Sequence, residues 1–119
     1  MSTNEVLVVA PEAGDRLADL LRQGSWTVYP AQNCSEALDH LSTHNTPVVI
    51  CESSLPDGDW KDLLDLASRL IVTARAADEA LWAEVLNLGG YDVLVQPFDA
   101  MEVARVVVSA WQNSRRSAA

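Results

Sequence analysis

A carboxylate stands at the end of one of the most apolar segments of the chain. Residues 47–51 read Pro-Val-Val-Ile-Cys, and Glu52 follows them directly. A short apolar run of this kind is typical of a buried strand in a parallel sheet, and ligands of such sheets collect at the carboxyl ends of the strands. Glu52 is therefore the first candidate for a functional side chain. Ser53 and Ser54 come next, but no partnering histidine completes a nucleophile–base pair, so a hydrolase finds no support.

Two other pairs of residues could bind a metal ion or form a disulfide. His40 and His44 are four residues apart, a spacing that can present two imidazoles on one helix face, but no third ligand is evident. We interpret them as surface histidines near the end of a helix. Cys34 and Cys51 have no metal-ligand spacing, and Cys51 reads as a small buried apolar residue. We therefore predict no metal site, no disulfide and no cofactor.

The composition excludes several classes of function. The net charge is −9, with eight basic residues, which argues against a nucleic-acid-binding face and against adhesion to anionic lipid. The chain has no apolar stretch near the ~20 residues of a membrane span, and its start lacks the features of a secretory signal. With 119 residues, 49% of them hydrophobic, it fits one globular domain, and we expect it in the cytoplasm.

Short β-rich runs alternate with helical runs along the whole chain. The expected strands cover 5–10, 26–29, 48–51, 70–73 and 91–95, and the expected helices 15–23, 35–41, 60–67, 78–88 and 99–113. This alternation predicts the α/β class, with a doubly wound, five-stranded parallel sheet in the flavodoxin-like strand order 2-1-3-4-5. One domain is expected over 1–119, with its core at about 5–113 and a frayed tail at 114–119.

Five segments, in order, resemble the receiver domain of response regulators, and the likeness spans residues 6 to about 111. They are Val-Leu-Val-Val at 6–9, Asn-Cys-Ser-Glu-Ala-Leu at 33–38, Leu-Pro-Asp-Gly-Asp at 55–59, Leu-Ile-Val-Thr-Ala at 70–74 and Gln-Pro-Phe at 96–98. The resemblance implies a non-enzymatic signalling domain of two-component systems. In that family an aspartate at the end of the third strand accepts a phosphoryl group in the presence of Mg²⁺.

The chain departs from the family at the residues that perform this chemistry. The two acidic residues that bind Mg²⁺ correspond to Ala10 and Pro11, and only the third acidic position, Glu12, is kept. The phosphoacceptor position carries Glu52, whose extra methylene displaces the carboxylate by more than about 1 Å, a shift that can cost an oriented reaction about a hundredfold. Loss of the metal would also remove the main stabiliser of phosphoryl transfer.

Two further departures affect the switching residues of the family. Its lysine at the end of the fifth strand is Gln96 here, and its switch aromatic is Val93, whereas the threonine is kept as Thr73. The comparison predicts a degenerate, or pseudo-receiver, domain that ordinary aspartyl phosphorylation does not switch. Its vestigial pocket is expected to contain Glu52, Thr73, Gln96 and Glu12.

Several interpretations of this pocket remain open from the sequence. Glu52 either imitates a phosphorylated aspartate by reaching toward the hydroxyl of Thr73, or is a solvated carboxylate without a role. An alternative function is a phosphorylatable receiver that uses Glu52 or a neighbouring carboxylate such as Asp57. A third is a flavodoxin-like domain that binds a small ligand, although residues 11–14 form no glycine-rich phosphate loop and include an acidic side chain.

The last helix carries two apolar stripes, where packing on a sheet requires one. The stripe at 103, 106, 107 and 110 should face the sheet. The second stripe, together with Trp82 of the preceding helix, is a candidate interface: Met101, Ala104, Val108, Trp111 and Trp82. The resemblance implies that the fourth helix, fifth strand and last helix form a surface for a homodimer, a signalling protein or a fused output domain. Trp60 could cover the pocket, make such a contact or pack on the short third helix.

Overall fold

A five-stranded parallel sheet forms the centre of the molecule because its strands are apolar on both faces. The computed structural model describes residues 4–76 and 78–117. The strands lie in the order β2 (Thr27–Ala31), β1 (Glu5–Val9), β3 (Val48–Glu52), β6 (Leu70–Ala74) and β7 (Asp92–Val95), all parallel. This order is the predicted one, so the α/β doubly wound fold is confirmed.

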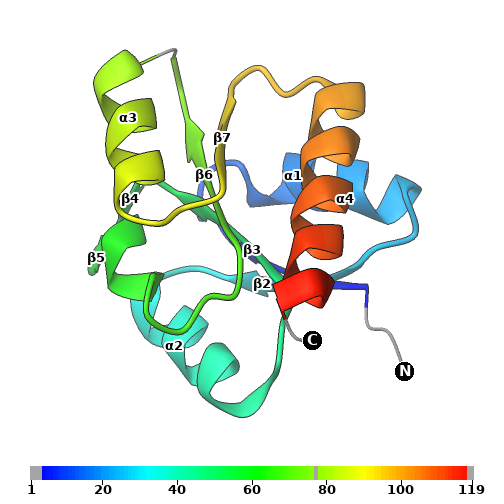
Figure 1. Ribbon diagram of the computed structural model, residues 1–119, viewed down its shortest axis with the longest axis horizontal. Coiled ribbons are helices and arrows are strands. Elements are labelled where there is room, and N and C mark those ends of the chain that lie inside the picture. The colour runs from blue at the N-terminus through cyan, green and yellow to red at the C-terminus, as the bar shows by residue number, and fades with distance from the viewer. Residues whose placement is uncertain (1–3, 77, 118–119) are drawn as a thin grey trace.

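Two layers of helices cover the sheet, one on each face (Figure 1). Helices α1 (Gly14–Gln23) and α4 (Ala100–Ser117) bury the side of β1 that carries Val6 and Val8. Helices α2 (Cys34–Thr43) and α3 (Glu79–Asn87) lie over the opposite side, which carries Leu7 and Val9. Successive side chains of a strand point to opposite faces, so each strand supplies residues to both halves of the core.

Side chains from neighbouring segments fix the starts of the helices. At the start of α2, the Asn33 side chain accepts a hydrogen bond from the backbone N–H of Glu36 (2.9 Å), and the Glu36 carboxylate accepts one from the backbone N–H of Gln32 (2.8 Å). Asp78 at the start of α3 likewise accepts from the backbone of Leu81 (3.1 Å). These caps satisfy N–H groups that the first turn of a helix leaves without partners.

The segment predicted as a third helix over 60–67 is mostly irregular. It begins after a small antiparallel hairpin, β4 (Ser54–Leu55) and β5 (Gly58–Asp59), and contains only the single-turn 3₁₀ helix η1 (Trp60–Leu63). The Trp60 side chain is 2% exposed within the core beside α2 and α3. Of the three roles open to Trp60, the structure shows the packing one.

Most predicted element boundaries move by one or two residues, and the end of α4 moves further. Helix α4 continues to Ser117, so the expected frayed tail is wrong over residues 114–117, and residues 118–119 lie outside the described residues. Strand β2 begins at Thr27 and runs two residues past its expected end at position 29, because an edge strand tolerates Pro30. Among the described residues no helix is long and apolar enough to cross a membrane.

Candidate functional site

Four positions extend the rows of side chains that face α1 and α4, at the carboxyl edge of the sheet. Val8 and Ile50 belong to those rows, and Ala10 and Glu52 lie two residues beyond them. Thr73 follows Ile71 in the same way, and the β3–β6 register pairs it with Glu52. Gln96 stands in the corresponding place two residues after Leu94 on β7. The fold therefore assembles the predicted pocket residues at one edge.

Glu52 is held by the backbone of the loop between β1 and α1. Its side chain is 7% exposed. One carboxylate oxygen, Oε2, accepts hydrogen bonds from the backbone N–H groups of Glu12 (3.0 Å) and Ala13 (2.8 Å). Ala13 is the N-cap of α1 and has no capping side chain of its own. The carboxylate of Glu52, at the end of β3, binds the N–H groups at and just before this N-cap, and its negative charge suits the positive end of the helix dipole.

The structure shows neither of the two arrangements of Glu52 that the sequence suggested. The carboxylate is neither freely solvated nor bonded to Thr73. Thr73 is 2% exposed, and its hydroxyl oxygen has no hydrogen-bond partner among the described residues. The longer glutamate reaches the β1–α1 loop, where the small side chain of Ala10 adds no competing charge.

Glu12 faces an arginine that sequence reasoning did not single out. An ion pair joins the Glu12 carboxylate to the Arg75 guanidinium, two residues after Thr73. Both side chains are largely exposed, at 65% and 74% of their areas, so the pair adds little to stability. Its place between the end of β6 and the β1–α1 loop makes Arg75 part of the site. The position of Arg75 just after a predicted strand could have indicated this from the sequence.

A pocket of about 670 Å³ opens between these strand ends and the start of α3. Glu12, Glu52, Thr73 and Gln96, the four predicted residues, all line it. Ser53, Ser54, Arg75, Asp78 and Glu79 add polar and charged groups to the same wall. The four residues named from the sequence thus line one cavity, and most of its additional polar lining comes from residues that the sequence had not singled out.

The neighbouring carboxylate Asp57 lies elsewhere. Its two oxygens accept hydrogen bonds from the backbone N–H groups of Cys34 (2.7 Å) and Ser35 (3.1 Å) at the start of α2. The N–H of Cys34, more than that of Ser35, holds the pKa of Asp57 below its usual range. Asp57 therefore joins the β4–β5 hairpin to α2 and does not line the pocket.

The residues of this edge do not fit the Mg²⁺ that receiver domains bind. Mg²⁺ needs several oxygen ligands in octahedral geometry, and the side chains of Ala10 and Pro11 supply none. Glu12 is paired with Arg75, and Glu52 with two N–H groups. Within the described residues, no group of three or more His, Cys, Asp or Glu side chains could hold a metal ion.

The cysteines and histidines lie outside the pocket. Cys34 and Cys51 are buried free thiols, and burial raises the pKa of Cys34 to about 11, with a further contribution from Asp57. The rings of His40 and His44 stack at 4.1 Å, and His40 Nε2 lies 3.0 Å from the hydroxyl of Thr46. His44 is exposed as expected, whereas His40 is half-buried.

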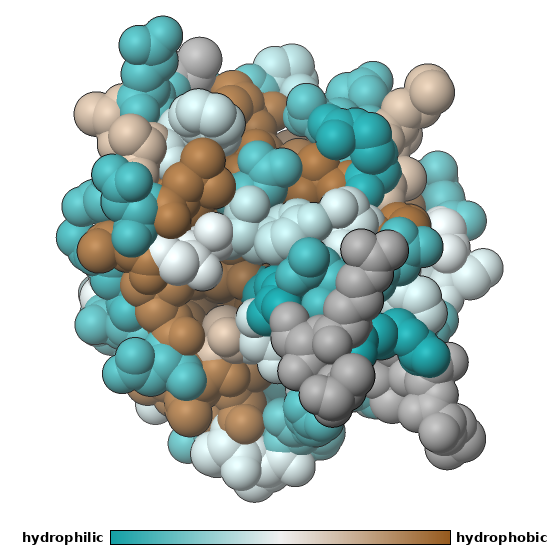
Figure 2. All heavy atoms as spheres, viewed as in Figure 1, coloured by the Kyte–Doolittle hydropathy of each residue, from teal (hydrophilic) through white to brown (hydrophobic). Residues whose placement is uncertain are grey.

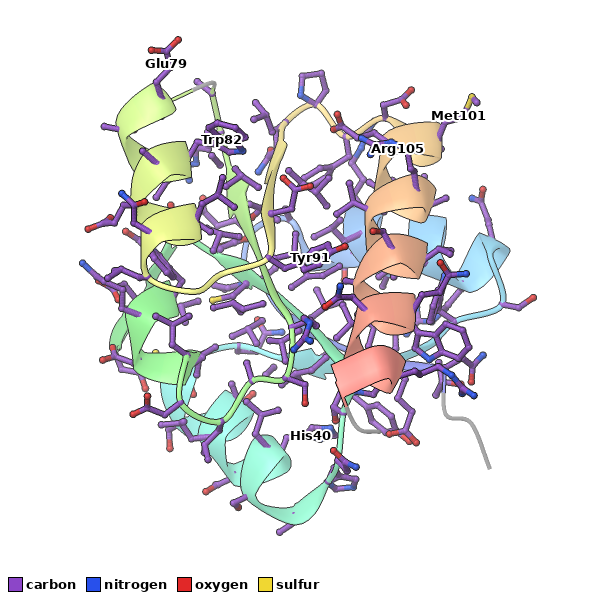
Figure 3. The ribbon with its side chains drawn as sticks, viewed as in Figure 1. His40, Glu79, Trp82, Tyr91, Met101 and Arg105 are labelled. Carbon is purple, nitrogen blue, oxygen red and sulfur yellow. The ribbon has the colours of Figure 1, made fainter. Side chains whose placement is uncertain are left out.

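The candidate interface lies on the face formed by α3, β7 and α4, which Figure 1 presents to the viewer. The inner stripe of α4 is buried as predicted, and the outer one is open: Met101 is 81% exposed and Val108 40%. Trp82 on α3 is 51% exposed (Figure 3). Trp111 differs, since it is half-buried and makes an edge-on contact with Trp26 at 6.1 Å. Figure 2 shows apolar surface over α3 and the adjoining part of this face.

Comparisons with known proteins find the fold but no sequence relative. No protein-family model matches the chain, and no curated protein matches it either. Solved structures do match: the chain has the fold of response-regulator receiver domains, from which it differs in most of its sequence.

Three of these structures illustrate the likeness. A CheY-like receiver domain protein from Methanospirillum hungatei JF-1 has a TM-score of 0.84 at 17% identity, covering 98% of this chain and 99% of that one. The beryllofluoride-activated NtrC4 receiver domain dimer has a TM-score of 0.84 at 21% identity, covering 94% and 99%. NtrX from Brucella abortus, in complex with ATP, matches 95% of this chain over 28% of its own length, with a TM-score of 0.86 and 20% identity.

Proposed function

We propose that this chain is a pseudo-receiver domain: a non-enzymatic, cytoplasmic signalling module that acts through protein–protein contacts without aspartyl phosphorylation. The observation that carries the proposal is the double hydrogen bond from the β1–α1 loop to Glu52. The carboxylate at the phosphoacceptor position is committed to capping α1. Attack on a phosphoryl group would require it to leave both N–H groups, without the metal and lysine that assist phosphoryl transfer in receivers.

The test is an amide NMR titration of the ¹⁵N-labelled domain with Mg²⁺ and beryllofluoride, a mimic of the phosphoryl group. We expect no saturable shifts at Glu52, Thr73 or Gln96. A variant that restores the family's residues, with Ala10→Asp, Pro11→Asp, Glu52→Asp and Gln96→Lys, is the positive control and should respond. Saturable shifts in the unchanged domain that spread to α3 and α4 would refute the proposal and favour a phosphorylatable receiver.

The surface that we propose for partner binding is the α3–β7–α4 face. Met101 and Val108 on α4 and Trp82 on α3 are exposed apolar side chains, and such exposed surface marks interaction sites where it is contiguous. The hydroxyl groups of Tyr91 and Ser109 are hydrogen-bonded, which fixes α4 to the start of β7. Figure 3 shows Arg105 projecting from α4 toward β7, where it adds a charge to this face, whereas Glu79 projects from the top of α3 into solvent.

Homodimerisation through this face can be tested by sedimentation equilibrium. Met101→Glu and Trp82→Glu each place a charge at an exposed apolar position, one on α4 and one on α3, and should shift the population to monomer. Leu66→Glu is the matched control, because Leu66 is 49% exposed but follows η1, outside the three elements. If both interface variants associate as the unchanged chain does, this surface is not a homodimer contact, and a different protein partner is left as its occupant.

A further inference from the structure

The pocket at the sheet edge contains polar groups that Glu52 does not reach. Its volume is about 670 Å³, and the Glu52 carboxylate lies against the β1–α1 loop. Thr73 is one of the residues that line the pocket and is 2% exposed; its hydroxyl oxygen is buried and has no hydrogen-bond partner among the described residues. Buried hydroxyls are nearly always paired, and leaving one unpaired costs free energy. A group that enters the pocket and hydrogen-bonds to Thr73 would remove this cost.

The charge of the pocket decides which kind of group fits. Among the described residues that line it are four carboxylates and one cation, Arg75, which is already paired with Glu12. None of the ion pairs among the described residues involves Glu52. Glu79 projects from the top of α3 into solvent (Figure 3), so it acts at longer range than Glu52. An anionic ligand would be repelled, whereas a cation would be attracted.

The hydrogen-bonding groups of the pocket indicate which kind of cation fits it. The residues do not form a metal site. The side chain of Gln96, half-buried at the end of β7, makes no hydrogen bond with the described residues, although its amide oxygen is an acceptor. Glu52 and Thr73, paired in the strand register, and Gln96 at the end of β7 thus bring a carboxylate, a hydroxyl and an amide oxygen to the same pocket. A primary ammonium group carries one positive charge and three N–H donors, and all three acceptors can receive one of them.

We infer that the pocket binds a primary ammonium group supplied by another molecule, bonded to Glu52, Thr73 and Gln96. The group belongs either to a small free amine or to a lysine side chain of a protein partner. The inference goes beyond the proposed function, because it holds whether or not the domain can be phosphorylated. The beryllofluoride titration tests the proposed function, and a separate titration with an amine tests ammonium binding.

The experiment is an amide NMR titration of the unchanged domain at pH 7 with methylammonium chloride. We expect saturable shifts centred on Glu52, Thr73 and Gln96, with a dissociation constant in the millimolar range. Tetramethylammonium chloride at the same ionic strength has the charge but no N–H donors, and should produce no saturable shift. Equal responses to the two salts, or no saturation with methylammonium below about 100 mM, would overturn the inference; a millimolar constant corresponds to only about 4 kcal/mol.

Two variants separate specific binding from a general effect of charge. Gln96→Lys places an ammonium group in the same pocket from within the chain and should abolish methylammonium binding while the fold persists. Thr73→Val removes one acceptor and should weaken binding about tenfold, as expected for one hydrogen bond. Methylammonium binding that survives unchanged in Gln96→Lys contradicts the assignment. A parallel titration with a short lysine-containing peptide identifies the source: tighter binding than methylammonium indicates a protein partner, and equal binding a small amine.

Discussion

Removing the Glu52 carboxylate should destabilise the fold, and the size of the effect can be worked out from its contacts. Two hydrogen bonds, of 3.0 and 2.8 Å, run from backbone N–H groups to one charged oxygen. Bonds to charged groups contribute roughly 1.5–3 kcal/mol each. The loop that donates them is partly exposed, so water recovers part of the loss. We therefore expect Glu52→Ala to lower the free energy of unfolding by about 2–4 kcal/mol, and Glu52→Gln by about 1 kcal/mol.

Relief of charge repulsion opposes the loss of these hydrogen bonds, so the sign of the measured change in the free energy of unfolding shows which effect is larger. Glu52 shares its pocket with Glu12, Asp78 and Glu79, so its removal also relieves repulsion between carboxylates. Arg75 already neutralises Glu12, and Asp78 accepts from the backbone of α3, which leaves the capping contribution as the larger of the two.

Urea unfolding followed by far-ultraviolet circular dichroism measures the change, provided that the m-value is constant. Glu36→Ala is the matched control, since Glu36 accepts from one exposed backbone N–H (2.8 Å) and should cost less than about 1 kcal/mol. In hydrogen exchange, the amides of Glu12 and Ala13 should lose protection in Glu52→Ala. If Glu52→Ala and Glu52→Gln are as stable as the unchanged chain, or more so, the capping role is refuted.

Three further predictions concern other parts of the molecule. Burial and the neighbouring His44 lower the pKa of His40, against a smaller opposing effect of Glu5. The contribution of neutral His40 to the free energy of unfolding should therefore be fully present above the unfolded pKa of about 6.5 and be lost as pH drops through the lower folded pKa. A His40→Gln variant whose stability has the same pH slope would contradict this. The pKa of Cys34, raised to about 11, predicts alkylation by iodoacetamide at pH 8 about a hundredfold slower than in urea, and equal rates would show an accessible thiolate. Gly90→Ala should cost about 1–3 kcal/mol by overpacking, because its Cβ would lie 2.5 Å from Val85 Cγ1, and a neutral result in thermal unfolding would show that the α3–β7 turn can relax.

The strands and their order were predictable because each carries its own pattern. The segment at 6–9 is apolar on both faces, which only a covered parallel sheet explains. The segment after Asp59 misled the prediction, since Trp60, Leu63, Leu64 and Ala67 have helical spacing. Trp60 and Leu63 enter the core, and the chain then turns toward β6. A few apolar residues at helical spacing are compatible both with a single 3₁₀ turn and with two turns of α-helix.

The site was predictable in its location but not in its bonding. Strand ends meet at one edge in any parallel sheet, so Glu52 and Thr73 could be placed together in advance. The direction in which Glu52 points depends on which N–H groups of a loop about 40 residues away lack partners, and no sequence pattern reports this. The contact between Trp111 and Trp26 is also long-range, and the apolar stripe on α4 did not distinguish that residue from exposed Met101.

The hydrogen bonds between Glu52 and the β1–α1 loop also determine how long this loop stays joined to the end of β3. An acyl phosphate is made at the expense of a phosphodonor and decays by hydrolysis, so a domain that carries one holds its state for a limited period. The contact described here uses only groups of the chain itself. It forms when the chain folds, and it opens only as often as the start of α1 opens. The contact itself therefore has no chemical half-life, and it lasts as long as the start of α1 stays closed.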